Sequence, residues 1–101
     1  MKLTWNIYEI QSKEGSLHGI MLRGRIRKFT IEKGITCLAE NASDKENTVR
    51  LALLEGQSPE EVVSFVENLS RGVFVEKVLS SIENPVLSKL KVNDSSRYSA
   101  E

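Results

Sequence analysis

The residues best suited to chemistry in this sequence lie in one short run, from Gly15 to Arg23. Two glycines, Gly15 and Gly19, are followed by the apolar residues 20–22 and then by Arg23. Glycines let backbone N–H groups converge on a ligand, and the start of a following helix adds partial positive charge. An arginine at that point can bind phosphate through two parallel hydrogen bonds. The run therefore indicates a cradle for a phosphate group or a similar small anion.

An amphipathic helix is predicted directly after the cradle, from Leu22 to Lys33. Leu22, Ile26 and Phe29 recur on one face at a spacing of about 100° per residue. Gly34 then provides a suitable C-terminal stop, because glycine readily adopts the left-handed conformation that ends many helices. This helix would hold the arginine of the cradle in its first turn.

The charge around this helix is one-sided. No acidic residue occurs between Glu14 and Glu32, and the basic residues in that interval are Arg23, Arg25, Arg27 and Lys28. We interpret the last three as a solvated helix face. Arg23 is set apart by its place beside the glycines, so we assign it to the anion.

Four further segments are predicted to be strands: Thr4–Gln11, Thr36–Asn41, Thr48–Glu55 and Val73–Leu79. In the first, Trp5 and Ile7 would face one side of a sheet and Tyr8 and Ile10 the other. The third is strongly apolar, so we expect it in the centre of the sheet. Asn41 ends the second strand, before a polar loop longer than a two-residue hairpin turn.

A second helix is predicted after the third strand. Ser58 as N-cap, Pro59 at the first helical position and Glu61 two residues later form a capping box. Apolar residues then follow at helical spacing, and Gly72 would close the helix. Beyond the fourth strand, 86–92 is interpreted as a short edge strand.

The element order, strand–helix–strand–strand–helix–strand, is typical of an α+β ferredoxin-like βαββαβ sandwich, with a four-stranded antiparallel sheet and both helices on one face. We expect one domain over residues 1–93 and a disordered polar tail over 94–101. RNA-recognition modules share this order, and 71–75 faintly resembles one of their motifs. That motif belongs on the third strand and needs aromatic residues that Val73 and Val75 do not supply, so we expect no nucleic-acid partner.

Bulk composition narrows the function classes further. The 101 residues include 14 basic and 14 acidic side chains, so no net field draws the protein to nucleic acid or a membrane. A single cysteine, Cys37, allows no internal disulfide, and the sequence has no Cys/His cluster for a metal. Residues 1–10 contain no continuous apolar run of the signal-peptide or membrane-spanning kind. We expect a cytoplasmic monomer without metal, cofactor or membrane contact.

The cradle run resembles the signature of the acylphosphatase family, Gly-x-Val-Gln-Gly-Val-x-Phe-Arg. Residues 15–23 read Gly-Ser-Leu-His-Gly-Ile-Met-Leu-Arg and keep both glycines and the arginine. Further along, Gly34-Ile35, Asn41 and Asp44 stand at the spacings of that family. Glu55-Gly56 and the Leu69–Gly72 interval match the ends of its third strand and second helix. The resemblance thus covers most of the chain.

This resemblance implies a hydrolase of carboxyl-phosphate bonds, with an acyl phosphate or inorganic phosphate as the small-molecule partner. Arg23 and the loop amides would hold the phosphoryl group, and Asn41 would orient the attacking water. The implied phosphate-binding residues are Gly15, Leu17, His18, Gly19, Ile20, Met21, Leu22 and Arg23. An alternative is a divergent, catalytically weak module that binds an anion or a protein partner, because the loops before Gly19 and after Asp44 are longer than in the family. His18 is either an exposed loop residue or an extra phosphate donor.

Overall fold

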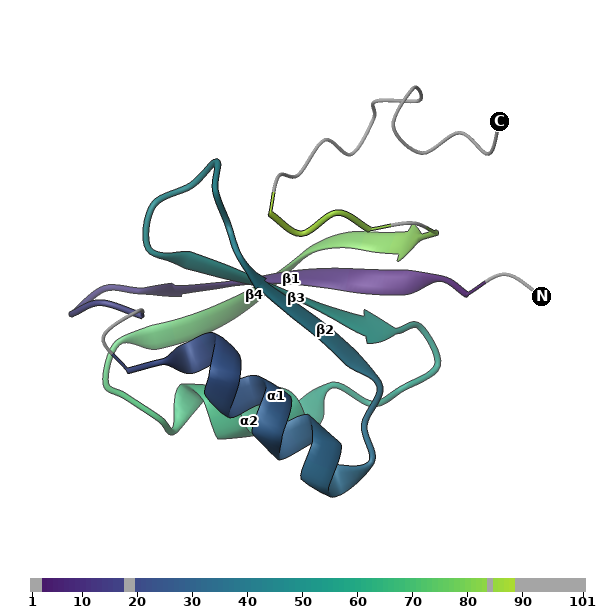
Figure 1. The fold of residues 1–101 in the computed structure, drawn as a ribbon, viewed down its shortest axis with the longest axis horizontal. Coiled ribbons are helices and arrows are strands. Elements are labelled where there is room, and N and C mark those ends of the chain that lie inside the picture. The colour runs from purple at the N-terminus through teal and green to yellow at the C-terminus, as the bar shows by residue number, and fades with distance from the viewer. Residues whose placement is uncertain (1–2, 18–19, 84, 89–101) are drawn as a thin grey trace.

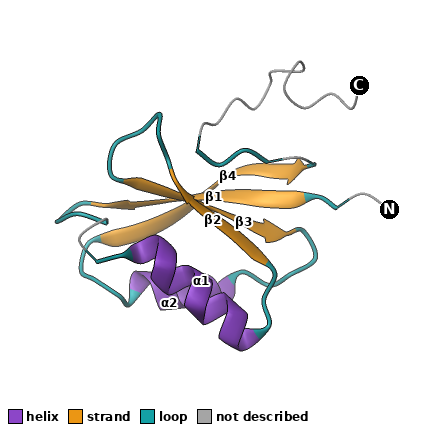
Figure 2. Ribbon diagram, viewed as in Figure 1, coloured by secondary structure: helices purple, strands orange, loops and turns teal. Residues whose placement is uncertain are grey.

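The fold is an antiparallel sheet backed by two helices. The computed structural model describes residues 3–17, 20–83 and 85–88. Its elements are β1 (Trp5–Ser12), α1 (Leu22–Lys33), β2 (Cys37–Asn41), β3 (Thr48–Leu54), α2 (Glu60–Glu67) and β4 (Val73–Ile82). The strands form one sheet in the order β2-β3-β1-β4, and each neighbouring pair is antiparallel. Both helices lie on the same face (Figures 1 and 2). The predicted ferredoxin-like α+β sandwich is confirmed.

The main core lies between the sheet and the helices. On β1, Tyr8 and Ile10 face this core, whereas Trp5 and Ile7 face the other side of the sheet, as the alternation predicts. From α1, the predicted apolar stripe is buried at Leu22 and Ile26. Phe29 of α1 stacks on Phe65 of α2 with ring centroids 4.1 Å apart, which fixes the two helices against each other.

The helix ends follow the sequence prediction for α1 but not for α2. Gly34 caps α1 in the left-handed conformation (φ 71°), and its N–H donates to the carbonyls of Thr30 and Ile31. At α2 the predicted capping box is wrong. Pro59 has helical torsions and accepts the first helical hydrogen bond from Val63, so Pro59 takes the N-cap position, and no side chain of the described residues caps the helix.

The predicted closure of α2 by Gly72 is also wrong, because the helix ends at Glu67 with Asn68 as its C-cap. Gly72 instead turns the chain into β4. Its φ is 85°, and a Cβ there would lie 3.2 Å from the backbone nitrogen of Glu14. Glycine is therefore needed where this turn passes the end of β1.

A second, smaller apolar cluster lies on the face of the sheet opposite the helices. It consists of Trp5, Ile7, Ala52 and Leu87. Leu87 belongs to the segment 85–88, which crosses this face beyond β4 and is not a strand. The predicted edge strand over 86–92 is therefore wrong for the part that the structure describes, and residues 89–92 lie outside it. The predicted tail, 94–101, also lies outside the described residues.

Candidate functional site

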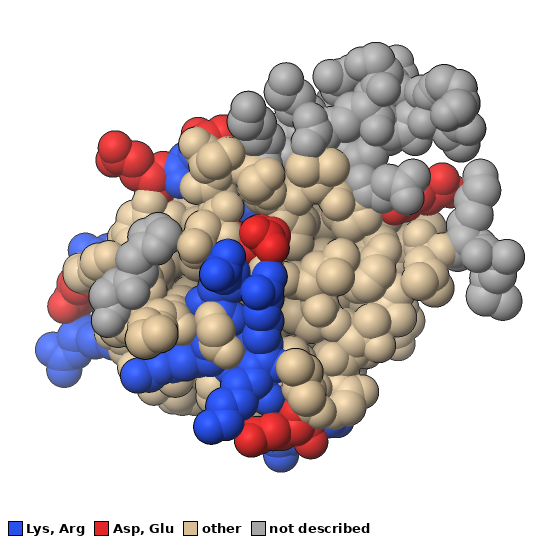
Figure 3. Space-filling view, viewed as in Figure 1, with Lys and Arg blue, Asp and Glu red and all other residues tan. Residues whose placement is uncertain are grey.

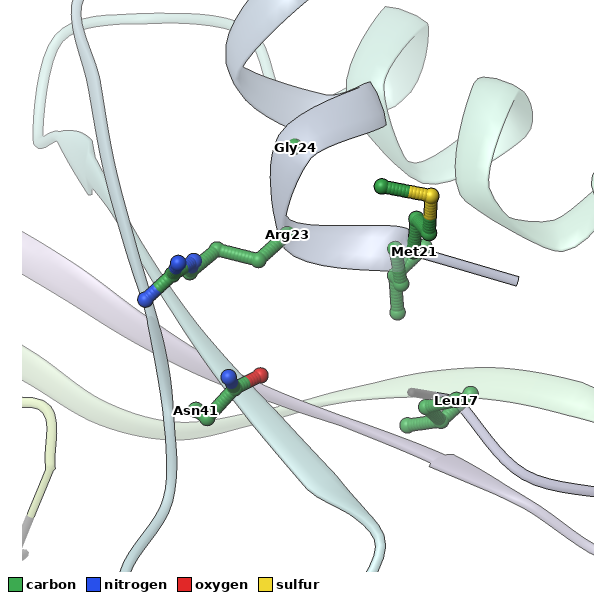
Figure 4. Close-up of a pocket in the computed structure, with 6 residues that line it drawn as sticks. Leu17, Met21, Arg23, Gly24 and Asn41 are labelled. Atoms are coloured by element: carbon green, nitrogen blue, oxygen red, sulfur yellow. The ribbon is translucent and has the colours of Figure 1, made fainter. Parts of the chain in front are cut away.

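An open pocket of about 220 Å³ lies between the start of α1 and the end of β2. Its lining residues are Leu17, Met21, Leu22, Arg23, Gly24 and Asn41. In Figure 4, Arg23 reaches from the first turn of α1 toward the side where Asn41 rises from β2, and Leu17 and Met21 stand on the other side. The fold thus brings together the two residues that the sequence singled out for catalysis.

The start of α1 contributes partial positive charge to this pocket. Met21 occupies the N-cap position in the left-handed conformation (φ 54°), and within the described residues no side chain caps the helix. The first turn contains no acidic residue. Because the first amides of a helix carry partial positive charge, this end of α1 favours an anion.

Two of the predicted phosphate-binding residues shape the pocket with their side chains. Leu17 and Leu22 are each only 1% exposed and belong to the main core. Their backbone N–H groups already have acceptors: the N–H of Leu17 donates to Oδ1 of Asn47 at 2.8 Å, and that of Leu22 donates to the carbonyl of Leu17 at 3.3 Å. An anion here would rely on Arg23 and on other donors of the first turn.

The remaining predicted binding residues are distributed around the pocket. Met21 lines it and is 74% exposed, whereas Gly15 and Ile20 are not among the lining residues. Gly15 makes the turn after β1 with φ 79°, and Ile20 packs against the core. His18 and Gly19 lie outside the described residues.

Glu40 is a charged neighbour of the pocket that the sequence analysis missed. Its Oε1 lies 3.8 Å from Nη1 of Arg23, and its Oε2 accepts a hydrogen bond from Nη2 of Arg27 at 2.8 Å. Arg27 also donates to the carbonyl of Ala39, so it covers the edge of β2. Basic side chains gather over the region of α1 in Figure 3, and Glu40 partly offsets their charge. One sequence feature could have pointed to Glu40: it directly precedes Asn41 on a predicted strand.

Cys37 lies near this region, but its thiol is unreactive at neutral pH. Burial raises the pKa of its thiol to about 12, even though a hydrogen bond with Thr30 and the charge of Arg27 act in the opposite direction. The thiol therefore stays protonated at neutral pH and is a poor nucleophile.

A second polar cluster lies on the opposite face of the sheet and is closely packed. Arg50 of β3, only 2% exposed, donates from Nε to Glu9 of β1 at 2.9 Å. Its Nη1 donates to Asp44 at 2.6 Å and to the carbonyl of Leu87 at 3.2 Å. Lys45 binds the other oxygen of Glu9 at 2.9 Å. We interpret this cluster as structural, because each of its buried charges is paired.

The pKa of Glu9 reflects these contacts. Burial raises it, but the hydrogen bonds and charges of Lys45 and Arg50 outweigh burial and hold the pKa below its usual value of 4.5. Glu9 is therefore an ionised, paired carboxylate at neutral pH.

The pocket beside α1 thus remains the best candidate site. Of the six described residues that line it, only Arg23 is ionisable, and Asn41 adds a carboxamide that both donates and accepts hydrogen bonds. Such a set can bind an anion and hold a water beside it.

Residues 3–17, 20–83 and 85–88 contain no group of three side chains arranged to hold a metal ion, and no helix in these ranges is long and apolar enough to cross a bilayer. Comparison with models of protein families, with curated proteins and with solved structures finds no match for this chain.

Proposed function

We propose that this protein is an acylphosphatase-like hydrolase that cleaves carboxyl-phosphate bonds in the pocket beside α1. The observation that carries the proposal is that Arg23 and Asn41 line one pocket at the start of a helix that no described side chain caps. They are the two residues to which the family resemblance assigns phosphate binding and water orientation. The ligand is a small acyl phosphate, with inorganic phosphate as product, and the protein acts as a cytoplasmic monomer.

In the proposed mechanism, Arg23 and the start of α1 hold the phosphoryl oxygens, and Asn41 holds a water on the far side of the phosphorus. The water oxygen attacks phosphorus while the bond to the acyl oxygen breaks, and the carboxylate leaves with the electron pair. The water protons end on phosphate and solvent. Because a carboxylate is a good leaving group, positioning and charge stabilisation can supply most of the catalysis. None of the described residues that line the pocket is a carboxylate that could act as a base, which suits this mechanism.

Phosphate competes with Glu40 for the guanidinium of Arg23. The pair of Arg23 and Glu40 is long, at 3.8 Å, and its side chains are 42% and 46% exposed. Half-exposed ion pairs of this kind contribute about 0–1 kcal/mol, so a phosphate dianion at the helix start can displace Glu40.

A second candidate is an anion-binding or partner-binding module with little turnover. It is favoured by the internal hydrogen bonds of the Leu17 and Leu22 amides, which leave fewer backbone donors for a transition state. Binding an anion tolerates loosely placed hydrogen-bond donors, whereas hydrolysis needs its donors placed to within about 1 Å.

The experiment that tests the proposal is hydrolysis of benzoyl phosphate by the wild type, Arg23→Ala and Lys33→Ala. Lys33 lies in the last turn of α1 and serves as the matched control for loss of one positive charge. We expect turnover by the wild type and Lys33→Ala, and a loss of about 10²-fold in Arg23→Ala. A folded wild type that binds phosphate in an NMR titration without hydrolysing benzoyl phosphate would leave the second candidate. Absence of both activities would overturn the hydrolase and the anion-binding form of the second candidate.

A further inference from the structure

Asn47 connects the loop between β2 and β3 to the segment that precedes the pocket. Its Oδ1 accepts the N–H of Leu17 at 2.8 Å, and its Nδ2 donates to the carbonyl of Gly15 at 3.0 Å. One carboxamide therefore uses its donor side and its acceptor side on a single short piece of backbone. Such a two-point contact fixes both the position and the orientation of that backbone.

The held segment is coupled directly to the start of α1. Leu17 is buried and lines the pocket, and its carbonyl accepts the N–H of Leu22, the first residue of the helix. Arg23 follows Leu22 in the same turn. A shift of Leu17 would therefore move the helix start and the base of the Arg23 side chain.

The loop that carries Asn47 is itself anchored. Asp44 binds Arg50 with both carboxylate oxygens, at 2.6 and 3.3 Å, and the N–H of Ala42 donates to the carbonyl of Thr48 at 2.9 Å. Asn47 adopts φ 49°, a left-handed conformation that asparagine tolerates better than most residues. The anchored loop thus presents the carboxamide from a fixed backbone.

We infer that Asn47 is the positioning residue of the phosphate pocket, and that it acts through Leu17 rather than by touching the ligand. The inference rests on the proposed function, because it concerns the geometry of the same pocket. Asn47 is not among the pocket-lining residues, which separates its role from those of Arg23 and Asn41.

The test compares wild type, Asn47→Gly and Asn47→Asp. The glycine variant keeps the left-handed backbone but loses both contacts, and the aspartate variant keeps the acceptor for Leu17 but loses the donor to Gly15. Gln57→Gly is the matched control, because Gln57 makes the same two-point contact, with the N–H and carbonyl of Thr36, at 2.9 and 2.8 Å. The measurements are phosphate Kd by NMR titration, benzoyl phosphate kinetics and hydrogen exchange of the Leu17 amide.

We expect Asn47→Gly to raise the phosphate Kd and the KM about tenfold, the size of losing one or two ordinary hydrogen bonds, and to speed exchange at Leu17. Asn47→Asp should give a smaller rise with Leu17 still protected, and Gln57→Gly should leave the Kd unchanged. Because the Kd is measured on folded protein, a loss of stability alone does not move it. If Asn47→Gly does not fold, Asn47→Asp is compared with the wild type at raised salt, which screens the added carboxylate, and an unchanged phosphate Kd there overturns the positioning role.

The two proposals fail in different ways. An active wild type with an unchanged Kd in the Asn47 variants would overturn the positioning role and leave the proposed function standing. A wild type that neither binds phosphate nor hydrolyses benzoyl phosphate would overturn the proposed function, and the positioning role would fall with it.

Discussion

Arg23 and Glu40 face each other across the gap between α1 and β2, with Nη1 and Oε1 3.8 Å apart. Arg27 holds the second oxygen of the same carboxylate at 2.8 Å. One acidic side chain therefore competes with any incoming anion for two guanidinium groups beside the pocket. Its effect on affinity is expected to be modest, because all three side chains are about half exposed and solvent screens their charges.

Removing that competitor should strengthen anion binding. We predict that Glu40→Gln lowers the phosphate Kd by up to about fivefold, equivalent to about 1 kcal/mol. Isothermal titration or NMR titration at low salt measures the change. Glu32→Gln, an exposed carboxylate in the last turn of α1, is the control for net charge and should have little effect. Weaker binding in Glu40→Gln would mean that Glu40 holds Arg23 in its binding position.

Arg23 and Asn41 should differ in the kinetic step that they affect. Arg23→Ala should weaken phosphate affinity as well as rate, because its contacts exist in ground and transition states. Asn41→Ala should lower kcat by about 10²-fold with the phosphate Kd nearly unchanged, because its proposed partner is the water. Steady-state kinetics beside a phosphate titration separates the two. Equal losses of affinity in both variants would contradict the assignment of Asn41 to the water.

The buried cluster on the other face should dominate stability. Arg50→Met removes the partner of Glu9 and Asp44 and leaves the Glu9 carboxylate buried beside Lys45 alone. We predict a fall of about 3–5 kcal/mol in the free energy of unfolding, measured by urea denaturation with Trp5 fluorescence. The double variant Glu9→Gln/Arg50→Met should recover part of this loss, since it no longer buries an unpaired charge. A loss below about 1 kcal/mol in Arg50→Met would show that water reaches the cluster.

The same cluster predicts a specific acid sensitivity. The pKa of Glu9 is held below 4.5 in the folded protein, so its contribution to stability is complete above that value and is lost as pH falls through the folded pKa. Unfolding free energy should therefore decrease below about pH 4.5, and less steeply in Glu9→Gln than in the wild type. Urea denaturation across pH 3–7 gives both slopes. If the unfolding free energy fell equally steeply with pH in both proteins, the acid sensitivity would come from other carboxylates.

The sequence was sufficient for the elements that rely on local patterns. The spacing of Leu22 and Ile26 and the stop at Gly34 predicted α1 with its observed bounds. Alternation in β1 assigned Trp5 and Tyr8 to opposite faces correctly. Such periodicity depends only on neighbouring residues, so no tertiary knowledge was needed. The capping box at Ser58 failed because the first helical hydrogen bond starts at the carbonyl of Pro59, one residue later than predicted.

The contacts around the candidate site could not be predicted from the sequence, because they join residues that are far apart in the chain. Glu40 reaches Arg23 and Arg27 because β2 is an edge strand next to α1, and Arg50 finds Glu9 because β3 pairs with β1 in one particular register. The contact between Asn47 and Leu17 spans 30 positions in the chain. None of these pairs has a local signature, so each required the topology to be known first.

The position of β1 inside the sheet has a consequence for synthesis. Its two neighbours, β3 and β4, both come later in the chain, and β4 ends only at Ile82. A ribosome therefore releases Ile7 and Ile10 well before the strands that cover them exist. The sheet cannot close until β4 has been made, so one edge of β1 stays unpaired while the chain is synthesised as far as Ile82.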